Sequence, residues 1–168
     1  MKIVINSKNK EEKEKIIAAI YSIFEKNNIL TLSTIKGKKP FSCSAYYVFD
    51  KDFNLYIWTE KESTHSKNIQ NNSSVAVNII NTSQKFGSEL QGLQIRGKAE
   101  PASGSELIKA GNLYMKRFPS VSKYVLKIRD FVSKKFESAI YKIEVENIKL
   151  MDEKNFGKEE YRNVLVKR

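Results

Sequence analysis

The sequence of 168 residues contains one cysteine, Cys43, and one histidine, His65. A single thiol cannot form an internal disulfide, and it cannot build a thiol metal cluster. A single imidazole excludes every metal site that needs several histidine ligands. We therefore expect neither a disulfide framework nor a metal centre.

Long apolar segments are also missing. No apolar run approaches the roughly 18–20 residues that a membrane-spanning helix needs. The first fifteen residues contain no apolar stretch followed by a small-residue cleavage site, which a secretory signal would have. We expect a cytoplasmic location and no membrane partner.

Negative charge is scarce: 30 lysines and arginines face 19 aspartates and glutamates, so the net charge is +11. A basic surface attracts polyanions, and a nucleic-acid-binding module is one function that it allows. However, nearly all the cations are lysines, whereas specific base readout usually relies on arginine. We therefore consider a nucleic-acid partner unlikely. We expect only that the positive electrostatic field of the protein favours a phosphorylated ligand.

The sequence does contain a regular series of helix and strand patterns. Residues 8–28 carry apolar side chains at helical spacing, which predicts an N-terminal helix. Short β-rich segments joined by tight turns follow, so those strands should be antiparallel neighbours. The patterns predict strands over residues 29–34, 40–49, 55–59, 75–80, 91–99 and 138–150, and further helices over 62–71, 101–117 and 120–135.

This order predicts one α+β domain over residues 1–168, built on a closed or partly closed antiparallel barrel. The N-terminal helix takes residues 1–28, and the barrel with its inserted helices takes 29–150. Residues 151–168 form a charged tail, which we expect to be frayed or to lie on a partner. No glycine-rich fingerprint follows a strand, which argues against a Rossmann sheet.

The richest local motif runs from Trp58 to Asn68, where a strand end leads into a helix start. A helix start offers free N–H groups and a partial positive charge, and both bind phosphate. Ser63 and Thr64 would add hydroxyl donors, while His65 and Lys67 would add positive charge. Ordinary helix capping beside surface charge would produce the same motif, so both interpretations remain.

Several segments in a fixed order carry a family resemblance. They are the hairpin residues 29–40, the two following strands 44–50 and 55–59, and the motif with Ser63, His65, Asn68 and Val75. Together, residues 28–79 resemble the pyridoxamine 5'-phosphate oxidase-like family of FMN-binding split barrels. A narrower resemblance over about residues 28–136, carried by residues 92–97 and 114–119 with His65, is to an uncharacterised bacterial subgroup of this fold.

The resemblance implies a split-barrel homodimer that binds FMN in clefts between its subunits. It implies either an FMN-dependent oxidoreductase that acts on an unknown small molecule or a protein that only binds the flavin. In that family the helix start carries the FMN phosphate, typically through a hydroxyl or an arginine and a lysine; here a histidine stands where lysine is common. No catalytic residue is assigned. The cofactor-binding residues that we expect are Thr59, Ser63, Thr64, His65, Lys67, Ser44 and Gln94.

The substrate, the cofactor and the role of His65 each have alternatives. True pyridoxamine phosphate oxidases end in an arginine-containing segment that holds the substrate, and residues 156–162 do not resemble it, so vitamin B6 oxidation is not assigned. Relatives of this fold also bind haem, although one histidine in mid-chain makes a weak case for axial ligation. His65 itself could contact the phosphate, move protons at the flavin, or be an ordinary surface residue.

Other side chains allow narrower expectations. Cys43 should be a small buried hydrophobic residue rather than a neighbour of the flavin edge. Trp58 should lie in the core or in a dimer interface, and Tyr46 and Tyr47 should point to opposite sides of their strand, with one of them buried. Gln94 lies between apolar residues, so it should find a partner in the barrel interior or on the cofactor.

Overall fold

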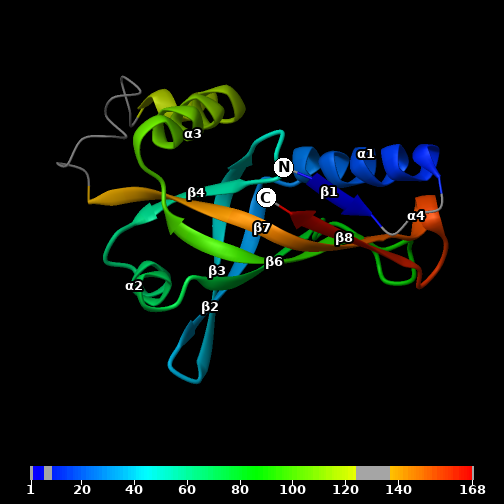
Figure 1. Cartoon of the computed structure of the whole chain (residues 1–168), viewed down its shortest axis with the longest axis horizontal. Coiled ribbons are helices and arrows are strands. Elements are labelled where there is room, and N and C mark those ends of the chain that lie inside the picture. Colours follow the sequence, from blue (N-terminus) through cyan, green and yellow to red (C-terminus); the bar gives the residue numbers. More distant parts are fainter. Residues whose placement is uncertain (1, 6–8, 124–136, 168) are drawn as a thin grey trace.

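The computed structural model describes residues 2–5, 9–123 and 137–167, and the elements below refer to those residues (Figure 1). The strands are β1 (Lys2–Ile5), β2 (Ile29–Lys36), β3 (Lys39–Phe49), β4 (Leu55–Glu60), β5 (Ser74–Ile80), β6 (Gln91–Pro101), β7 (Ser138–Asp152) and β8 (Tyr161–Lys167). The helices are α1 (Lys10–Lys26), α2 (Thr64–Asn71), α3 (Gly104–Arg117), the short α4 (Glu153–Phe156) and a 3-10 turn, η1 (Pro119–Lys123).

Six of the strands close into a ring. The pairing runs from β7 through β4, β3, β2, β5 and β6 and returns to β7, and every pair is antiparallel. Strand β7 can close the ring because it is long: residues 138–143 pair with β4 on one edge, while residues 141–152 pair with β6 on the other. The predicted α+β fold with an antiparallel split barrel is confirmed.

Gly97 lets β6 and β7 approach each other closely where the ring closes. The register between β6 and β7 shifts between Arg96 and Gly97, which marks a bulge. A β-carbon at Gly97 would overlap the backbone carbonyl oxygen of Glu144. Only glycine therefore permits the two backbones to approach so closely.

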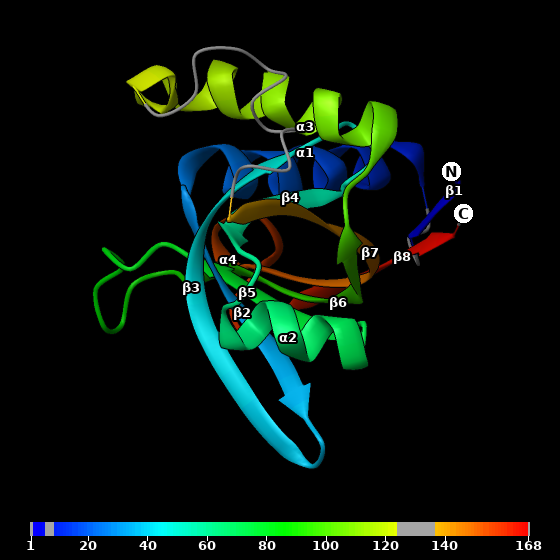
Figure 2. The same ribbon diagram turned by 90° about the vertical axis from the view of Figure 1, so that its left-hand side faces the viewer.

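Helix α1 covers one opening of the barrel, as Figures 1 and 2 show. Its start is capped by Asn9, whose side-chain oxygen accepts the backbone N–H of Glu12 at 2.8 Å. Its apolar stripe is fully or almost fully buried against the barrel interior, through Ile16, Ile20, Ile23 and Phe24. Burial of each such side chain stabilises the fold by roughly 1.5–3 kcal/mol.

Helix α3 packs on the outside of the barrel, against β3, β4 and β7. The Tyr114 hydroxyl accepts the backbone N–H of Trp58 at 2.8 Å and lies 2.9 Å from the carbonyl oxygen of Tyr46, to which it donates. Between α3 and these strands lies an apolar cluster of Val48, Tyr56, Ala110, Tyr114 and Ile140, and the half-buried Trp58 packs against it. Tyr47 is fully buried and Tyr46 is 61% exposed, so the expected division between these two residues is confirmed.

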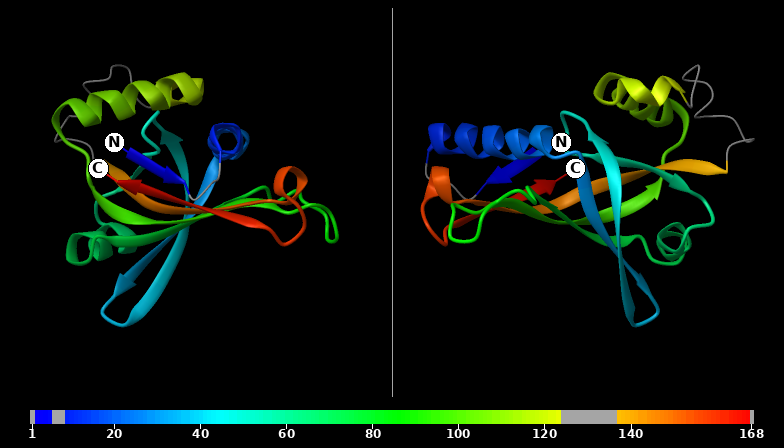
Figure 3. Two further views of the ribbon diagram at one scale, coloured as in Figure 1. Left: turned by 45° about the vertical axis from the view of Figure 1, so that its right-hand side comes forward. Right: turned by 180° about the vertical axis from the view of Figure 1, so that it is seen from behind.

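Two expectations differ from the structure at the ends of the chain. The charged tail is not frayed: it forms α4 and then β8, which pairs with β7 and β1 and buries Val164 and Val166. Strand β1 was not predicted, and Figure 3 shows it beside β8, with the two chain ends close together. The helix predicted over 120–135 falls mostly on residues 124–136, which lie outside the described residues; only the turn η1 is seen at its start.

Among the residues described, no helix is both long enough and apolar enough to cross a membrane.

Candidate functional site

The turn between β4 and α2 is held by its own hydroxyl groups. Ser63 caps the helix, because its Oγ accepts the backbone N–H of Ser66 at 3.3 Å. The Ser66 hydroxyl in turn donates to the Glu60 carbonyl oxygen at 2.7 Å. The start of α2 is therefore locked to the end of β4, on the side of the barrel opposite to α1 and α3 (Figure 2).

Three of the predicted residues meet at this turn. The Nε2 atom of His65 lies 2.7 Å from Thr59 Oγ1 and 3.1 Å from Ser63 Oγ. This nitrogen carries either one lone pair or one proton, so it can pair fully with only one hydroxyl at a time. We call Thr59, Ser63 and His65 the hydroxyl–imidazole cluster.

The protonation of the cluster follows from its burial. Desolvation lowers the pKa of His65 below its ordinary value of 6.5, because burial penalises the charged imidazolium. At neutral pH the imidazole of the protein alone is therefore uncharged, and Nε2 can accept a hydrogen bond from a hydroxyl. The cluster offers a phosphate polar donors rather than a permanent positive charge.

Thr64 and Lys67 flank the cluster. Thr64 is the first residue of α2 and is exposed. Lys67 is also exposed, and its ammonium group lies 3.1 Å from the carboxylate of Glu62. An exposed ion pair of this kind is weak, so an anionic ligand could compete with Glu62 for the lysine.

Sequence reasoning missed a buried pair behind the cluster. The side-chain amide of Asn68 donates to Thr34 Oγ1 at 3.0 Å, and both residues are buried. This bond ties α2 to β2. A signal was present, because Thr34 continues the inward positions of Leu30 and Leu32 on β2, and a polar group at such a position needs a partner.

Ser44 and Gln94 lie away from the cluster, on the outer face of the sheet. The strand register places Ser44 beside Thr31, Thr31 beside Asn78, and Asn78 beside Gln94. Both predicted residues are exposed, so Gln94 does not point into the barrel as one expectation had it. The outer-face position follows from strand alternation, because Leu93 and Ile95 take the inward positions.

The outer face around Gln94 is hollowed. A polar depression of about 500 Å³ lies over β2, β5, β6, β7 and β8 and includes Arg96, Asn147, Lys149 and Asn163. The seven predicted residues thus fall into two groups, one at the start of α2 and one on this outer face. Within the described ranges, no three histidine, cysteine, aspartate or glutamate side chains gather closely enough to hold a metal ion.

Comparison with known proteins agrees with this architecture. A family model described as pyridoxamine 5'-phosphate oxidase matches residues 16–152. A UPF0306 protein of Yersinia pestis is 31% identical over 104 residues, which cover 61% of this chain and 70% of that protein.

Two of the solved structures that superpose on this chain illustrate the shared fold. A heme binding protein from Mycobacterium smegmatis superposes with a TM-score of 0.69 and 13% identity, over 88% of this chain and 56% of that one. A putative pyridoxamine 5'-phosphate oxidase from Listeria innocua superposes with a TM-score of 0.60 and 19% identity, over 81% of this chain and 98% of that one. At these identities the similarity concerns the fold alone.

Proposed function

We propose that this chain, which belongs to the pyridoxamine 5'-phosphate oxidase family, is a cytoplasmic flavoprotein. It binds FMN by its phosphate at the start of α2. The observation that carries this proposal is the hydroxyl–imidazole cluster of Thr59, Ser63 and His65. These side chains come from a strand end, a helix cap and a first helical turn, and the fold brings their polar atoms to one point.

The donors present fit a phosphate group. The backbone N–H groups of Thr64 and His65 belong to the first turn of α2, where no carbonyl of the helix can pair with them. The helix dipole adds a partial positive charge at the same place. The hydroxyls of Thr59 and Ser63 can turn toward a phosphate oxygen, and Lys67 can exchange its weak pair with Glu62 for a stronger one.

His65 would change its protonation when the phosphate binds. Burial keeps the pKa of the free imidazole low, whereas a neighbouring phosphate dianion favours the imidazolium and raises that pKa. FMN binding should therefore take up a proton, and FMN affinity should rise as the pH falls through the raised pKa. When bound, FMN would supply electron transfer through its flavin ring; the protein would anchor the phosphate and shape access to the ring.

We also propose a homodimer that acts as an FMN-dependent oxidoreductase on a small molecule. Ile29 and Tyr46 are paired on neighbouring strands and are 48% and 61% exposed, and a second copy could cover this apolar pair. Ser44 and Gln94 lie on the same outer face, where they could meet the flavin of a dimer. Sedimentation of the FMN-loaded protein as a monomer at micromolar concentration would contradict this part of the proposal.

Haem is the second candidate cofactor, because a solved haem-binding protein shares the fold. The cluster favours FMN. The Nε2 atom of His65, one of the two imidazole nitrogens that could coordinate iron, already lies between two hydroxyls, and breaking those contacts would cost free energy. Absorbance of the purified protein separates the two: flavin bands support the proposal, and a Soret band would replace it.

Titration with FMN and with riboflavin tests the phosphate assignment. A charge-assisted phosphate contact is worth roughly 1.5–3 kcal/mol, so FMN should bind about ten to a hundred times more tightly than riboflavin. Ser63→Ala and His65→Ala should each reduce this preference, whereas Ser105→Ala, an exposed serine at the start of α3, should leave it unchanged. His65→Lys should keep FMN affinity and remove its pH dependence between pH 6 and 8. Equal affinities for FMN and riboflavin would refute the assignment.

A further inference from the structure

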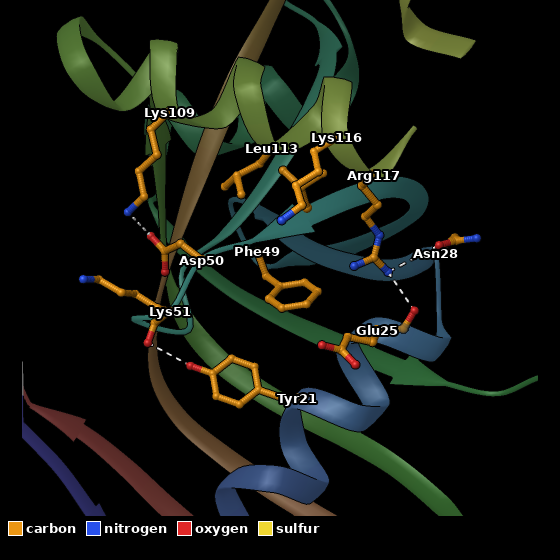
Figure 4. Close-up of a pocket in the computed structure, with 11 residues that line it drawn as sticks. Tyr21, Glu25, Asn28, Phe49, Asp50, Lys51, Lys109, Leu113, Lys116 and Arg117 are labelled. Carbon is orange, nitrogen blue, oxygen red and sulfur yellow. Dashed lines mark hydrogen bonds and ion pairs between the residues drawn. The ribbon is translucent and has the colours of Figure 1, made fainter. Parts of the chain in front are cut away.

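A second cavity, which the proposed cofactor site does not use, lies between α1 and α3 above the turn that joins β3 to β4 (Figure 4). Its volume is about 780 Å³, within the range typical of small-molecule pockets. It lies at the opposite end of β4 from the hydroxyl–imidazole cluster, because Asp50 precedes that strand and Thr59 lies near its end. The lining residues that matter for the argument are Tyr21, Phe49, Asp50, Lys109, Leu113, Lys116 and Arg117.

Arg117 forms a fixed cationic wall of this pocket. One terminal nitrogen, Nη2, donates to the carbonyl oxygens of Phe24 at 2.7 Å and Asn27 at 2.8 Å, at the end of α1. The guanidinium also lies 5.1 Å from the ring centres of both Tyr47 and Phe49. These contacts hold the cation in place before any ligand arrives, which lowers the entropic cost of binding.

The hydrogen bonding of Arg117 is incomplete. Its Nε–H is buried and makes no hydrogen bond of ordinary geometry among the described residues, although the Tyr47 hydroxyl lies close to the guanidinium. The other terminal nitrogen, Nη1, makes no hydrogen bond among the described residues and is not buried. Figure 4 shows this side of the guanidinium beside Lys116 and Phe49, where an anionic group could accept a hydrogen bond from it.

The pocket carries surplus positive charge. Lys109 is neutralised, because it pairs with the buried carboxylate of Asp50. Lys51 and Lys116 make no ion pair within the described part of the chain, and Figure 4 shows the Lys116 side chain pointing into the cavity. Beside the neutralised pair of Lys109 and Asp50, Lys116 and Arg117 therefore face one further carboxylate, that of Glu25, while Figure 4 shows the Lys51 ammonium group pointing away from the cavity.

Part of the pocket lining is apolar. This part consists of Tyr21, Val48 and Phe49 on one side and Leu113 of α3 on the other. The Tyr21 hydroxyl donates to the Lys51 carbonyl oxygen at 2.8 Å, which fixes that ring at the rim. An apolar lining beside a cationic wall selects ligands that have both an apolar body and an acidic head.

We propose that this pocket is a second ligand site, which binds a small organic anion through Lys116 and Arg117 and buries its apolar body on Phe49 and Leu113. The anionic head is a carboxylate or a phosphate monoester, because either one matches the surplus charge. The site does not depend on FMN binding, since it shares no residue with the start of α2.

The fluorescent anion 8-anilinonaphthalene-1-sulfonate, which combines an acidic head with an aromatic body, is a suitable probe. We expect one saturable site per chain. Lys116→Gln should weaken the probe about ten-fold, as expected for a lost charge-assisted contact, and Leu113→Trp should block it by filling the cavity. Lys38→Gln, the same charge change at the exposed turn between β2 and β3, should alter affinity less than two-fold.

Competition identifies the chemistry of the head group. Decanoate and decyl phosphate should displace the probe, and their relative potencies decide between a carboxylate and a phosphate ligand; decanol and decyltrimethylammonium should not displace it. Near-ultraviolet circular dichroism and FMN titration of each variant verify that the fold and the cofactor site are intact. Equal probe affinity in Lys116→Gln, Leu113→Trp and the unmodified protein, or equal displacement by decanol, would overturn the proposal.

Discussion

Asp50 organises the turn between β3 and β4, and Asp50→Asn tests how much that turn contributes to stability. Its Oδ1 accepts the backbone N–H groups of Asp52 at 2.8 Å and Asn54 at 3.0 Å. Its Oδ2 accepts the Asn54 side-chain amide at 2.8 Å and the Tyr56 hydroxyl at 3.0 Å, and it pairs with Lys109. An asparagine could keep the first two bonds, but it would place an NH₂ donor where the other three donors converge.

The size of the destabilisation follows from the hydrogen bonds and the ion pair that Asp50→Asn removes. A hydrogen bond to a charged group contributes roughly 1.5–3 kcal/mol, and breaking a buried ion pair costs about 3–5 kcal/mol. Lys109 is partly exposed, so its ammonium group can turn to water and recover part of that cost. We expect Asp50→Asn to lower the free energy of unfolding by about 3 kcal/mol, which corresponds to a fall in Tm of roughly 6–12 °C for a domain of this size.

Urea unfolding of both proteins measures this difference, provided that the slope m is unchanged. Glu62→Gln is the matched control, because it removes an exposed ion pair with Lys67 and should cost less than about 1 kcal/mol. A loss for Asp50→Asn no larger than that of the control would refute the reasoning.

The pH dependence of stability provides a second test of Asp50. Burial alone would raise the pKa of this carboxyl, but hydrogen bonds from Asn54 and Lys109 outweigh it and hold the pKa below the ordinary value of 3.8. A group whose pKa is depressed in the folded state stabilises fully above its unfolded pKa, and that stabilisation disappears as the pH falls through the lower folded pKa. The unmodified protein should therefore lose this contribution below about pH 4, and Asp50→Asn should lack that part of the acid destabilisation.

The remaining predictions concern the barrel itself and are measured by the same unfolding assay. Gly97→Ala should lower the free energy of unfolding by more than about 3 kcal/mol, because the new methyl group would overlap the Glu144 carbonyl oxygen. An unchanged urea midpoint would show that the bulge can move. Val164→Ala should cost about 1–3 kcal/mol, whereas Leu165→Ala, one residue along and exposed, should stay within about 0.5 kcal/mol. Similar losses for these two variants would mean that β8 does not pack on the core as described.

Much of the barrel could be predicted because its strands alternate. Strand β5 buries Val75, Val77 and Ile79 and exposes the residues between them, and this pattern can be read directly from the sequence. The helix after β4 was predicted over residues 62–71, and it begins at Thr64 because Ser63 caps it. Prediction from local patterns succeeded where one short segment contains both the alternation of its apolar residues and the residues that end the helix or strand.

The tail was harder to predict because its pattern is short. Strand β8 has only two buried residues, Val164 and Val166, and its other positions carry polar, charged or exposed apolar side chains. Its stability depends on β7 and β1, which pair with it from distant parts of the chain. A sequence window that covers only the tail contains neither partner, so charge dominated the interpretation.

The predicted site divided into two groups for a related reason. Thr59, Ser63 and His65 lie within seven residues of one another, and local geometry was sufficient to bring them together. Ser44 and Gln94 share one face of the sheet only through the register of four strands, which no local pattern specifies. Family resemblance supplied those two residues, but not the face on which they lie.

For the charge of the proposed phosphate site, the expectation from composition differs most from the structure. A net charge of +11 with His65 and Lys67 beside a helix start suggests recognition by cations. In the protein without a ligand, however, burial lowers the pKa of His65, and Lys67 pairs with Glu62. In the proposed site, hydroxyls, N–H groups and the helix dipole are therefore the first donors, and His65 and Lys67 would add positive charge only once the phosphate is bound. The net charge then acts mainly at long range, where salt screens it within about 8–10 Å. Added salt should accordingly slow FMN association more than it speeds dissociation.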